Sequence, residues 1–270
     1  MNNFLDRALA YYYRMTMKSP DFIGIGAQRA GTTWLYELLS LHPSIFLPEQ
    51  KELHFFDEKP DFESYQGIWN PVRPQYHDLA SGAEWRWYLA RFEEGKNDQL
   101  RGEFTPIYAT LSEKRVLAIS RYLPKVKIIY IIRDPVQRAW SNFRFSWNNH
   151  THGRGPEPSE DVMRKTIFYP AKLVHGDYRR NICVWEKCFR RDSLLYLLYD
   201  DIIDRPSAVL DQTCDFLGIA RMNVNAARLR DKTNRAPEAR MPEGIKSMLE
   251  EHFSVQRDFI KEKFGRSLKY

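Results

Sequence analysis

The chain has 270 residues, of which 43% are hydrophobic and 28% charged, and this composition is typical of a globular protein. Its formal net charge of +6 is spread along the chain, which contains no basic block of the kind that binds nucleic acid. No stretch approaches the roughly 20 apolar residues that span a bilayer, and no apolar core of signal-peptide length lies near residue 1. We therefore expect a single cytoplasmic domain over residues 1–270, with no integral membrane segment and no nucleic-acid partner.

The three cysteines, Cys183, Cys188 and Cys214, predict neither a disulfide framework nor a metal site. Their number is odd, and their spacing differs from that of zinc ligands. We expect them to be small buried residues of a reduced compartment.

Residues 1–20 are predicted to form a helical extension. Several apolar residues of this segment share one helix face at a spacing of three to four residues: Phe4, Leu5, Ala8, Leu9 and Tyr12. We expect this face to pack on the domain rather than on a membrane.

Three units of strand followed by helix come next along the chain. Each joins a short apolar run to a segment with apolar residues at helical spacing. The pairs are residues 21–26 with 31–41, residues 126–132 with 136–147, and residues 193–199 with 208–217, the last helix being closed by Gly218. A final helix is predicted over residues 242–264. Alternating strands and helices indicate an α/β fold with a central parallel sheet flanked by helices.

Two segments are predicted to be long loops. Residues 61–84 are rich in proline, glycine and aromatic residues, and residues 148–158 are polar and rich in glycine and proline. Loops of this length usually cover or form a binding site.

The strongest motif is Gly-Ala-Gln-Arg-Ala-Gly-Thr-Thr at residues 26–33, between the first strand and its helix. It has the glycine spacing of a nucleotide-phosphate loop, but Thr32 stands where that loop has lysine, and the cation, Arg29, lies inside the loop. Free amides at a helix N-terminus and hydroxyls bind phosphate oxygens well. The motif favours a metal-free group that carries a 5'-phosphate, and the alternative is a glycine turn with no ligand.

A second motif, Arg-Asp-Pro-Val-Gln-Arg-Ala-Trp-Ser at residues 133–141, follows the second strand. Arg133 lies at a strand end, where ligands of open α/β sheets bind, and Ser141 lies one to two turns into the next helix. A guanidinium and a hydroxyl suit a second phosphate group. The alternative is an arginine–aspartate pair that caps the strand.

Together these segments resemble the 5'-phosphosulfate loop and the 3'-phosphate motif of the sulfotransferases that use 3'-phosphoadenosine 5'-phosphosulfate (PAPS). The segment Lys-Glu-Leu-His-Phe-Phe-Asp at residues 51–57 is similar to one in the heparan sulfate (carbohydrate) branch. Weaker matches lie at residues 41–43, 85–92, 102–108 and 176–178, and the resemblance extends over residues 21–270.

The resemblance implies a P-loop-like sulfotransferase fold, PAPS as cofactor, 3',5'-adenosine bisphosphate as product and a small-molecule or glycan acceptor. It also implies two sets of contacts to the nucleotide. Around the 5'-phosphosulfate stand Arg29, Ala30, Gly31, Thr32, Thr33 and Trp34, and around the 3'-phosphate stand Arg133 and Ser141. A late loop at residues 232–240 would close over the cofactor, with Lys232 and Arg235 as its candidate cations.

An acceptor hydroxyl must lose its proton during transfer, so a general base is needed within hydrogen-bond reach. The candidates are Glu52, His54 and Glu103. The resemblance favours Glu52, whose pKa would fall on pairing with Lys51 and rise on burial, and the sequence leaves that balance open. His54 has the more suitable intrinsic pKa. With Arg29, Glu52 and His54 make up the candidate catalytic set.

Two departures from the family stand out. The family loop has lysine at the position of Arg29, and arginine keeps the charge but cannot act as an acid. Heparan-type relatives have lysine at the position of Phe104, which argues against a heparan-like acceptor.

The main alternative function is an ATP-dependent small-molecule kinase on a related phosphate-loop fold. It would need the missing loop lysine and a metal-binding aspartate, for which Asp134 and Asp200 are available. A non-catalytic module that binds an anion is a second alternative.

Overall fold

The computed structural model describes residues 2–57, 79–230 and 239–269. Its centre is a five-stranded sheet with the strand order β2-β3-β1-β4-β5, in which every pair of neighbours is parallel. The strands are β1 (Phe22–Gly26), β2 (Ile45–Phe46), β3 (Leu100–Phe104), β4 (Lys127–Ile132) and β5 (Leu194–Leu198). The predicted parallel α/β fold is confirmed, and the three predicted strands lie within one residue of β1, β4 and β5.

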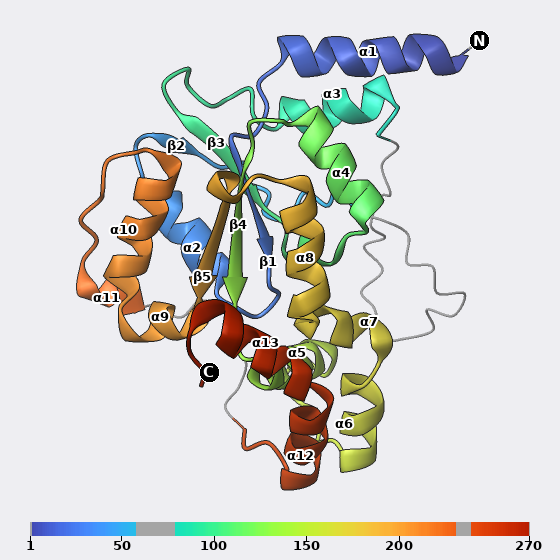
Figure 1. Cartoon of the computed structure of the whole chain (residues 1–270), viewed down its shortest axis with the longest axis vertical. Helices are drawn as coiled ribbons and strands as arrows, with labels where there is room; N and C mark the ends of the chain where they lie inside the picture. The colour runs from blue at the N-terminus through green and yellow to red at the C-terminus, as the bar shows by residue number, and fades with distance from the viewer. Residues whose placement is uncertain (1, 58–78, 231–238, 270) are drawn as a thin grey trace.

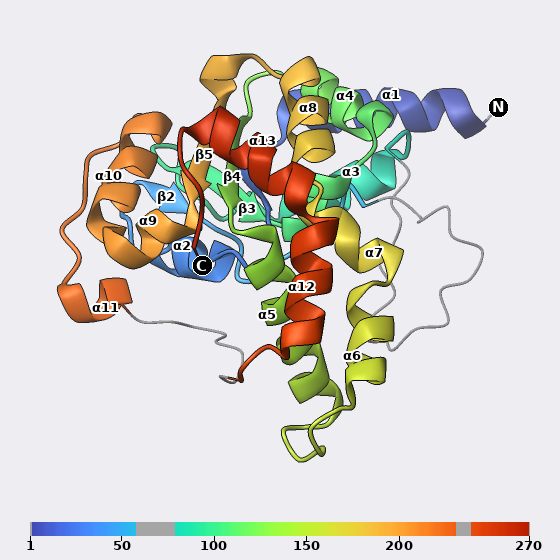
Figure 2. The ribbon, with the colours of Figure 1, turned by 60° about the horizontal axis from the view of Figure 1, so that its bottom comes forward.

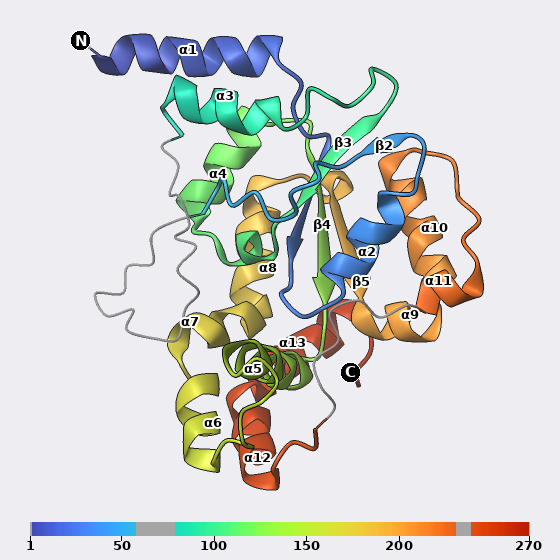
Figure 3. The same ribbon diagram turned by 180° about the vertical axis from the view of Figure 1, so that it is seen from behind.

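Helices cover both faces of the sheet and its carboxyl end. Figures 1 and 3 show α2, α9 and α10 on one side and α4 and α8 on the other, with α5, α6 and α12 beyond the carboxyl ends of the strands. The helices of at least eight residues are α1 (Asn2–Thr16), α2 (Thr32–Leu39), α3 (Gly82–Ala90), α4 (Glu113–Tyr122), α5 (Pro135–His150), α6 (Glu160–Ile167), α8 (Tyr178–Cys188), α10 (Pro206–Leu217), α12 (Glu243–His252) and α13 (Ser254–Phe264). Shorter ones are α7 (Pro170–Leu173), α9 (Tyr199–Asp204) and α11 (Ala226–Arg230).

The prediction of one final helix over residues 242–264 is wrong, because the chain turns at Phe253 between α12 and α13. Phe253 is buried in a cluster with Val136 of α5 and Ile245 and Leu249 of α12. The turn lets α12 pack on α5 and α6 while α13 packs on α8. One straight helix could not bury both apolar faces. The predicted end of α10 is confirmed, with Gly218 in the left-handed region at φ 79°.

The two predicted loops fare differently. Residues 148–150 still belong to α5, and residues 151–158 form neither helix nor strand. Most of the predicted loop at residues 61–84 lies outside the described residues. Its last residues are helical instead, because the Ser81 hydroxyl caps α3 by accepting a hydrogen bond from the Glu84 amide.

The helical extension is present as α1, but the predicted packing of its apolar face is wrong. Phe4, Leu5, Leu9 and Tyr12 are exposed, and Ala10 is buried instead. α1 lies against α3, where the Asp6 carboxylate accepts a hydrogen bond from the Gly82 amide at 2.8 Å. A Cβ at Gly82 would lie 2.6 Å from the Leu9 Cβ, so this close approach of the two helices selects the face that is buried.

The three cysteines are free thiols, but only Cys214 is buried as expected, whereas Cys183 is exposed. Within the described residues, no helix combines the length and the apolar character that a bilayer crossing needs.

Candidate active site

The loop between β1 and α2 ends in a helix start with no side-chain cap. Gly31 is the N-cap at φ 91° and ψ 15°, and as a glycine it offers no side chain to the first amides of α2. A Cβ at this position would lie 3.2 Å from Ile202 and 3.4 Å from the Tyr199 ring, which adds a steric reason for glycine. Thr32 and Ala30 are buried. The uncapped amides and the positive end of the helix dipole suit an anion.

Arg29 extends from this loop toward α5. Its φ of 64° is in the left-handed region, which is unfavourable for a residue with a side chain. The guanidinium lies 4.1 Å from the centre of the Phe145 ring, and its Nε is 3.4 Å from the Ser141 hydroxyl. Burial and the neighbouring Arg133 charge lower the pKa of Arg29 to about 10, so Arg29 remains a cation at neutral pH.

Arg133, at the end of β4, joins the second motif to the first. Its Nη1 donates a hydrogen bond to the Arg29 carbonyl at 2.6 Å, and its guanidinium lies 4.3 Å from the centre of the Tyr199 ring. The structure therefore brings Arg29, Arg133 and Ser141 together at one place.

The alternative interpretation of the second motif, an Arg133–Asp134 pair that caps the strand, does not describe the structure. Asp134 instead caps α5 by accepting a hydrogen bond from the Gln137 amide at 2.9 Å, and it pairs with Arg257 of α13 at 3.2 Å. Arg133 is thus left to face the phosphate loop.

Phe145 and Tyr199 are two site residues that the sequence analysis missed. Each supplies the aromatic face beneath one of the two guanidinium groups. Such contacts favour a cation that is partly withdrawn from water. A signal was present for both: Phe145 follows Ser141 by four residues on the same helix face, and Tyr199 directly follows a buried strand.

The segment at residues 51–57 is anchored by its aromatic residues. Phe55 stacks on Tyr88 with ring centres 4.2 Å apart, and the Phe56 amide donates to the Tyr108 hydroxyl at 3.2 Å. The Glu52 amide donates to the Phe104 carbonyl at the end of β3, at 3.1 Å. Both Glu52 (φ 63°) and His54 (φ 56°) lie in the left-handed region. Since such conformations persist only where the surroundings enforce them, the anchored rings fix the positions of these two side chains.

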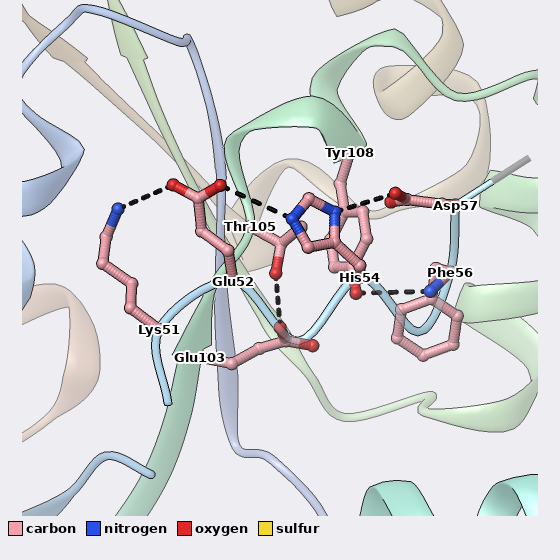
Figure 4. Close-up of polar contacts among 8 residues, drawn as sticks. All are labelled: Lys51, Glu52, His54, Phe56, Asp57, Glu103, Thr105 and Tyr108. Atoms are coloured by element: carbon pink, nitrogen blue, oxygen red, sulfur yellow. Dashed lines mark hydrogen bonds and ion pairs between the residues drawn. The ribbon is translucent and has the colours of Figure 1, made fainter. Parts of the chain in front are cut away.

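Four charged side chains of this segment form a continuous network (Figure 4). The Lys51 Nζ lies 3.0 Å from one Glu52 oxygen, and the His54 Nε2 lies 3.6 Å from the other. On the far side of its ring, the His54 Nδ1 lies 2.8 Å from the Asp57 carboxylate. Glu52 and His54 remain 38% exposed, whereas Asp57 is buried.

The network separates two of the candidate bases. Burial alone would raise the pKa of Glu52, but the hydrogen bonds and charges of His54 and Lys51 outweigh it and hold the pKa below its ordinary value. Burial alone would lower the pKa of His54, but Asp57 and Glu52 outweigh it and raise that pKa to about 10. At neutral pH Glu52 is therefore an accessible carboxylate, while His54 is protonated and cannot accept a proton.

Glu103, the third candidate, is enclosed in the core at 2% exposure. It accepts hydrogen bonds from the Tyr88 hydroxyl at 2.6 Å and the Thr105 hydroxyl at 2.8 Å. Burial raises its pKa to about 7, against the opposing effect of these two hydrogen bonds. Its burial keeps it from an external acceptor, so Glu52 is the candidate base that the geometry favours.

The pKa of Glu103 predicts a pH-dependent stability. The folded state favours the neutral Glu103 carboxyl. The stabilisation of the folded state by this proton is complete below the ordinary pKa near 4.5 and is lost as pH rises through about 7. Between about pH 5 and about pH 8 the wild-type free energy of unfolding should fall by about 2 kcal/mol more than that of Glu103→Gln. Urea denaturation of both proteins measures the difference, with the exposed Glu94→Gln as the control. Parallel pH curves for wild type and Glu103→Gln would contradict the assignment.

Three further residues were predicted to contact the nucleotide: Trp34, Lys232 and Arg235. The Trp34 ring is buried, and its Nε1 donates to the Leu229 carbonyl at 2.9 Å, which ties α2 to α11. Lys232 and Arg235 lie outside the described residues. Within the described part of the chain, no group of three or more histidine, cysteine or acidic side chains is arranged to hold a metal ion.

Glu52, Arg29 and Arg133 lie at the carboxyl ends of three neighbouring strands, in the order of those strands in the sheet. Glu52 is attached at the end of β3, the Arg29 loop follows β1, and Arg133 follows β4. Figure 2, which turns this end of the molecule forward, shows α2 and α5 there, the helices that follow β1 and β4. Strands are spaced about 4.8 Å apart, so a carboxylate and two cations are arrayed along a short path.

The parallel sheet with helices on both faces and the glycine loop between β1 and α2 define an α/β protein of the P-loop-like class. Residues 19–265 match the model of the sulfotransferase domain. The chain belongs to the sulfotransferase family.

Individual relatives agree with this family. The chain is 33% identical over 158 residues to the membrane-associated sulfotransferase kil1 of Dictyostelium discoideum, covering 57% of this chain and 29% of that protein. It is 26% identical over 237 residues to human heparan sulfate glucosamine 3-O-sulfotransferase 3B1, covering 83% and 53%. The crystal structure of a sulfotransferase from Alicyclobacillus acidocaldarius shares the fold, with a TM-score of 0.68, 23% identity and coverage of 93% and 98%. The chain thus spans about half, or less, of these two curated relatives.

Proposed function

We propose that the protein transfers a sulfuryl group from PAPS to an acceptor hydroxyl or amine, with Glu52 as the general base. The observation that carries the proposal is the meeting of Arg29, Arg133 and Ser141 beside the uncapped start of α2. Two guanidinium groups and the backbone amides at the start of α2 can together bind a nucleotide with phosphate groups at both its 3' and 5' positions.

The residues divide into two binding groups. Arg133 and Ser141 would hold the 3'-phosphate, and Arg29 with the amides of residues 30–34 would hold the 5'-phosphosulfate. The ring of Tyr199 beneath Arg133 keeps that guanidinium in place. Lys232 and Arg235 stay predictions for the loop that closes over the nucleotide.

PAPS bound at the carboxyl ends of the strands would supply an activated sulfuryl group, whose bond to the 5'-phosphate oxygen would break as the bond to the acceptor forms. Glu52 takes the proton that the acceptor loses. Arg29 and the α2 amides stabilise the negative charge that develops on the phosphate oxygen. In transfers of this type, such charge stabilisation is expected to contribute more to the rate than proton removal does. Arg29 acts only as a cation because arginine does not give up its proton.

His54 and Lys51 position the base. Their cationic groups flank the Glu52 carboxylate on both sides, and Asp57 fixes the far side of the His54 ring. This arrangement keeps Glu52 ionised and aimed outward, although it also makes Glu52 a weaker base.

We propose a carbohydrate as the acceptor, with support from the similarity to the human heparan sulfate enzyme over most of this chain. Phe104 sets a limit on that similarity. Its buried ring packs edge-on against Phe22 and Tyr36, so no cation is presented from this position. An acceptor less anionic than heparan sulfate fits the site better. The cytoplasmic location stays a prediction.

Nucleotide selectivity tests the proposal. In a thermal shift assay without metal, 3',5'-adenosine bisphosphate should raise the unfolding temperature, whereas ATP with Mg²⁺ should raise it less at equal concentration. A ligand at about 100 times its Kd stabilises the folded state by about 2.7 kcal/mol. Transfer of labelled sulfate from PAPS to a panel of sugars, phenols and amines then identifies the acceptor. Preference for ATP, together with metal-dependent phosphoryl transfer, would instead support the kinase alternative.

A further inference from the structure

The outer face of α1 is apolar and open to solvent. Six large hydrophobic side chains of this helix are exposed, from 47% at Leu9 to 80% at Phe4. They are Phe4, Leu5, Leu9, Tyr11, Tyr12 and Met15. In the rest of the described chain, the other exposed large hydrophobic residues occur singly on different elements. A concentrated patch of this kind marks an interaction surface.

The patch is continuous around the helix. At about 100° per residue, these six residues and Ala8 occupy an arc of about 160°. Thr16 also lies in the arc, and its hydroxyl donates to the Tyr12 carbonyl at 2.8 Å. The opposite side holds Asp6 and Ala10 and contacts α3. One side of α1 therefore packs on the domain. The apolar arc lies in solvent except at its border, where Leu9 approaches Gly82 of α3.

Cations border this apolar arc. Arg7 lies beside it on α1, and Arg86 and Arg91 come from α3 and its end, all three exposed. Among the described residues, no carboxylate pairs with Arg7 or Arg86. The Arg91 guanidinium lies 4.8 Å from the centre of the Trp87 ring. Trp87 and Arg86 line the groove between the two helices, together with Asp6 and Leu9 of α1.

We propose that α1 docks in the plane of an anionic phospholipid surface, as a peripheral contact. The apolar arc would enter the boundary between headgroups and acyl chains. Tyr11, at the border of the arc, and the arginines would lie at headgroup level, as in interfacial amphipathic helices. Charge favours lipid over a second copy of this chain, because a second copy would present the same arginines to Arg7 and Arg86, whereas anionic lipid complements them.

The position of α1 is compatible with activity in the docked state. Figures 1 and 3 show α1 at one end of the molecule and the carboxyl ends of the strands toward the other. The Arg29 loop follows β1 and therefore lies at the carboxyl end, away from α1. Docking through α1 would leave that edge open to nucleotide and acceptor. This inference does not depend on the proposed reaction.

Co-sedimentation of the full chain with vesicles tests the inference. The protein should bind vesicles of phosphatidylcholine mixed with phosphatidylserine more tightly than vesicles of phosphatidylcholine alone. The variant Arg7→Gln/Arg86→Gln should lose affinity for the mixed vesicles by roughly fivefold for each arginine and change little on the neutral ones.

The apolar arc is tested by Phe4→Ser/Tyr12→Ser/Met15→Ser, which should abolish binding to both vesicle types. Its matched control is Leu117→Ser/Met248→Ser/Val255→Ser, which changes three exposed hydrophobic residues on other elements and should bind as the wild type does. Unchanged unfolding temperatures would show that both triple variants are folded.

Three outcomes would overturn the inference. The first is that the wild-type protein sediments with neither vesicle type, and the second is that both triple variants lose binding equally. The third is that the wild type does not bind vesicles and forms a dimer in sedimentation equilibrium, whereas Phe4→Ser/Tyr12→Ser/Met15→Ser is a monomer. That result would assign the apolar face of α1 to contact with a second copy of the chain.

Discussion

Replacing Glu52 by glutamine should lower kcat by about 10²- to 10⁴-fold while leaving the affinity for 3',5'-adenosine bisphosphate unchanged. Glutamine keeps the shape of Glu52 and an oxygen for Lys51, but it cannot take the acceptor's proton. Single-turnover transfer of labelled sulfate measures the chemical step, and calorimetry measures nucleotide binding. The control is Glu49→Gln, an exposed glutamate three residues away, which should transfer sulfate at the wild-type rate. A kcat for Glu52→Gln equal to that of the wild type would remove Glu52 from the mechanism.

The pH profile separates Glu52 from His54. With Glu52 as base, the wild-type rate should be flat around neutral pH and fall only below the ordinary pKa of a glutamate, because its carboxylate is held ionised. With His54 as base, the rate should climb about tenfold per pH unit toward the His54 pKa of about 10, since only the neutral imidazole accepts a proton. A profile that climbs between neutral and alkaline pH would reassign the base to His54.

Replacing Arg133 by alanine should weaken binding of 3',5'-adenosine bisphosphate on the order of a hundredfold, and binding of 5'-AMP far less. The expected difference arises because the 3'-phosphate would lose its half-buried cationic partner, while the loop after β1 would keep its contacts to the 5'-phosphate. Some loss for 5'-AMP is also expected, because Arg133 hydrogen bonds to the Arg29 carbonyl of that loop. Calorimetric titration with each nucleotide gives the two Kd ratios.

Two further variants make the Arg133 result specific. Arg154→Ala removes an exposed cation beyond α5 and should leave both affinities unchanged. Ser141→Ala should repeat the selective loss in weaker form, because it removes one hydroxyl and no charge. Equal losses of the two nucleotides in Arg133→Ala would mean that Arg133 supports the loop and does not recognise the 3'-phosphate.

Where the sequence predicted strands correctly, the residues were apolar and contiguous. β1 and β4 are almost wholly buried, and β5 is an apolar run in which buried and half-buried residues alternate. Such runs can be recognised without knowing the neighbours of their side chains. β3 was missed because Arg101, Gly102 and Glu103 interrupt its apolar pattern, and β2 because it has only two residues. Gly102 has a packing reason that only the fold reveals: a Cβ there would lie 2.2 Å from the Phe22 ring of β1.

The sequence by itself determined where the two motifs at residues 26–33 and 133–141 lie, because each is a short stretch in which a strand end, a helix start and a cation follow one another along the chain. Only the tertiary structure separates the three candidate bases. The pKa values of Glu52, His54 and Glu103 depend on burial and on partners such as Asp57 and Tyr88, and that balance cannot be calculated from a list of residues. It also decided which face of α1 is buried, since an amphipathic pattern gives the faces of a helix but not the neighbour against which it packs.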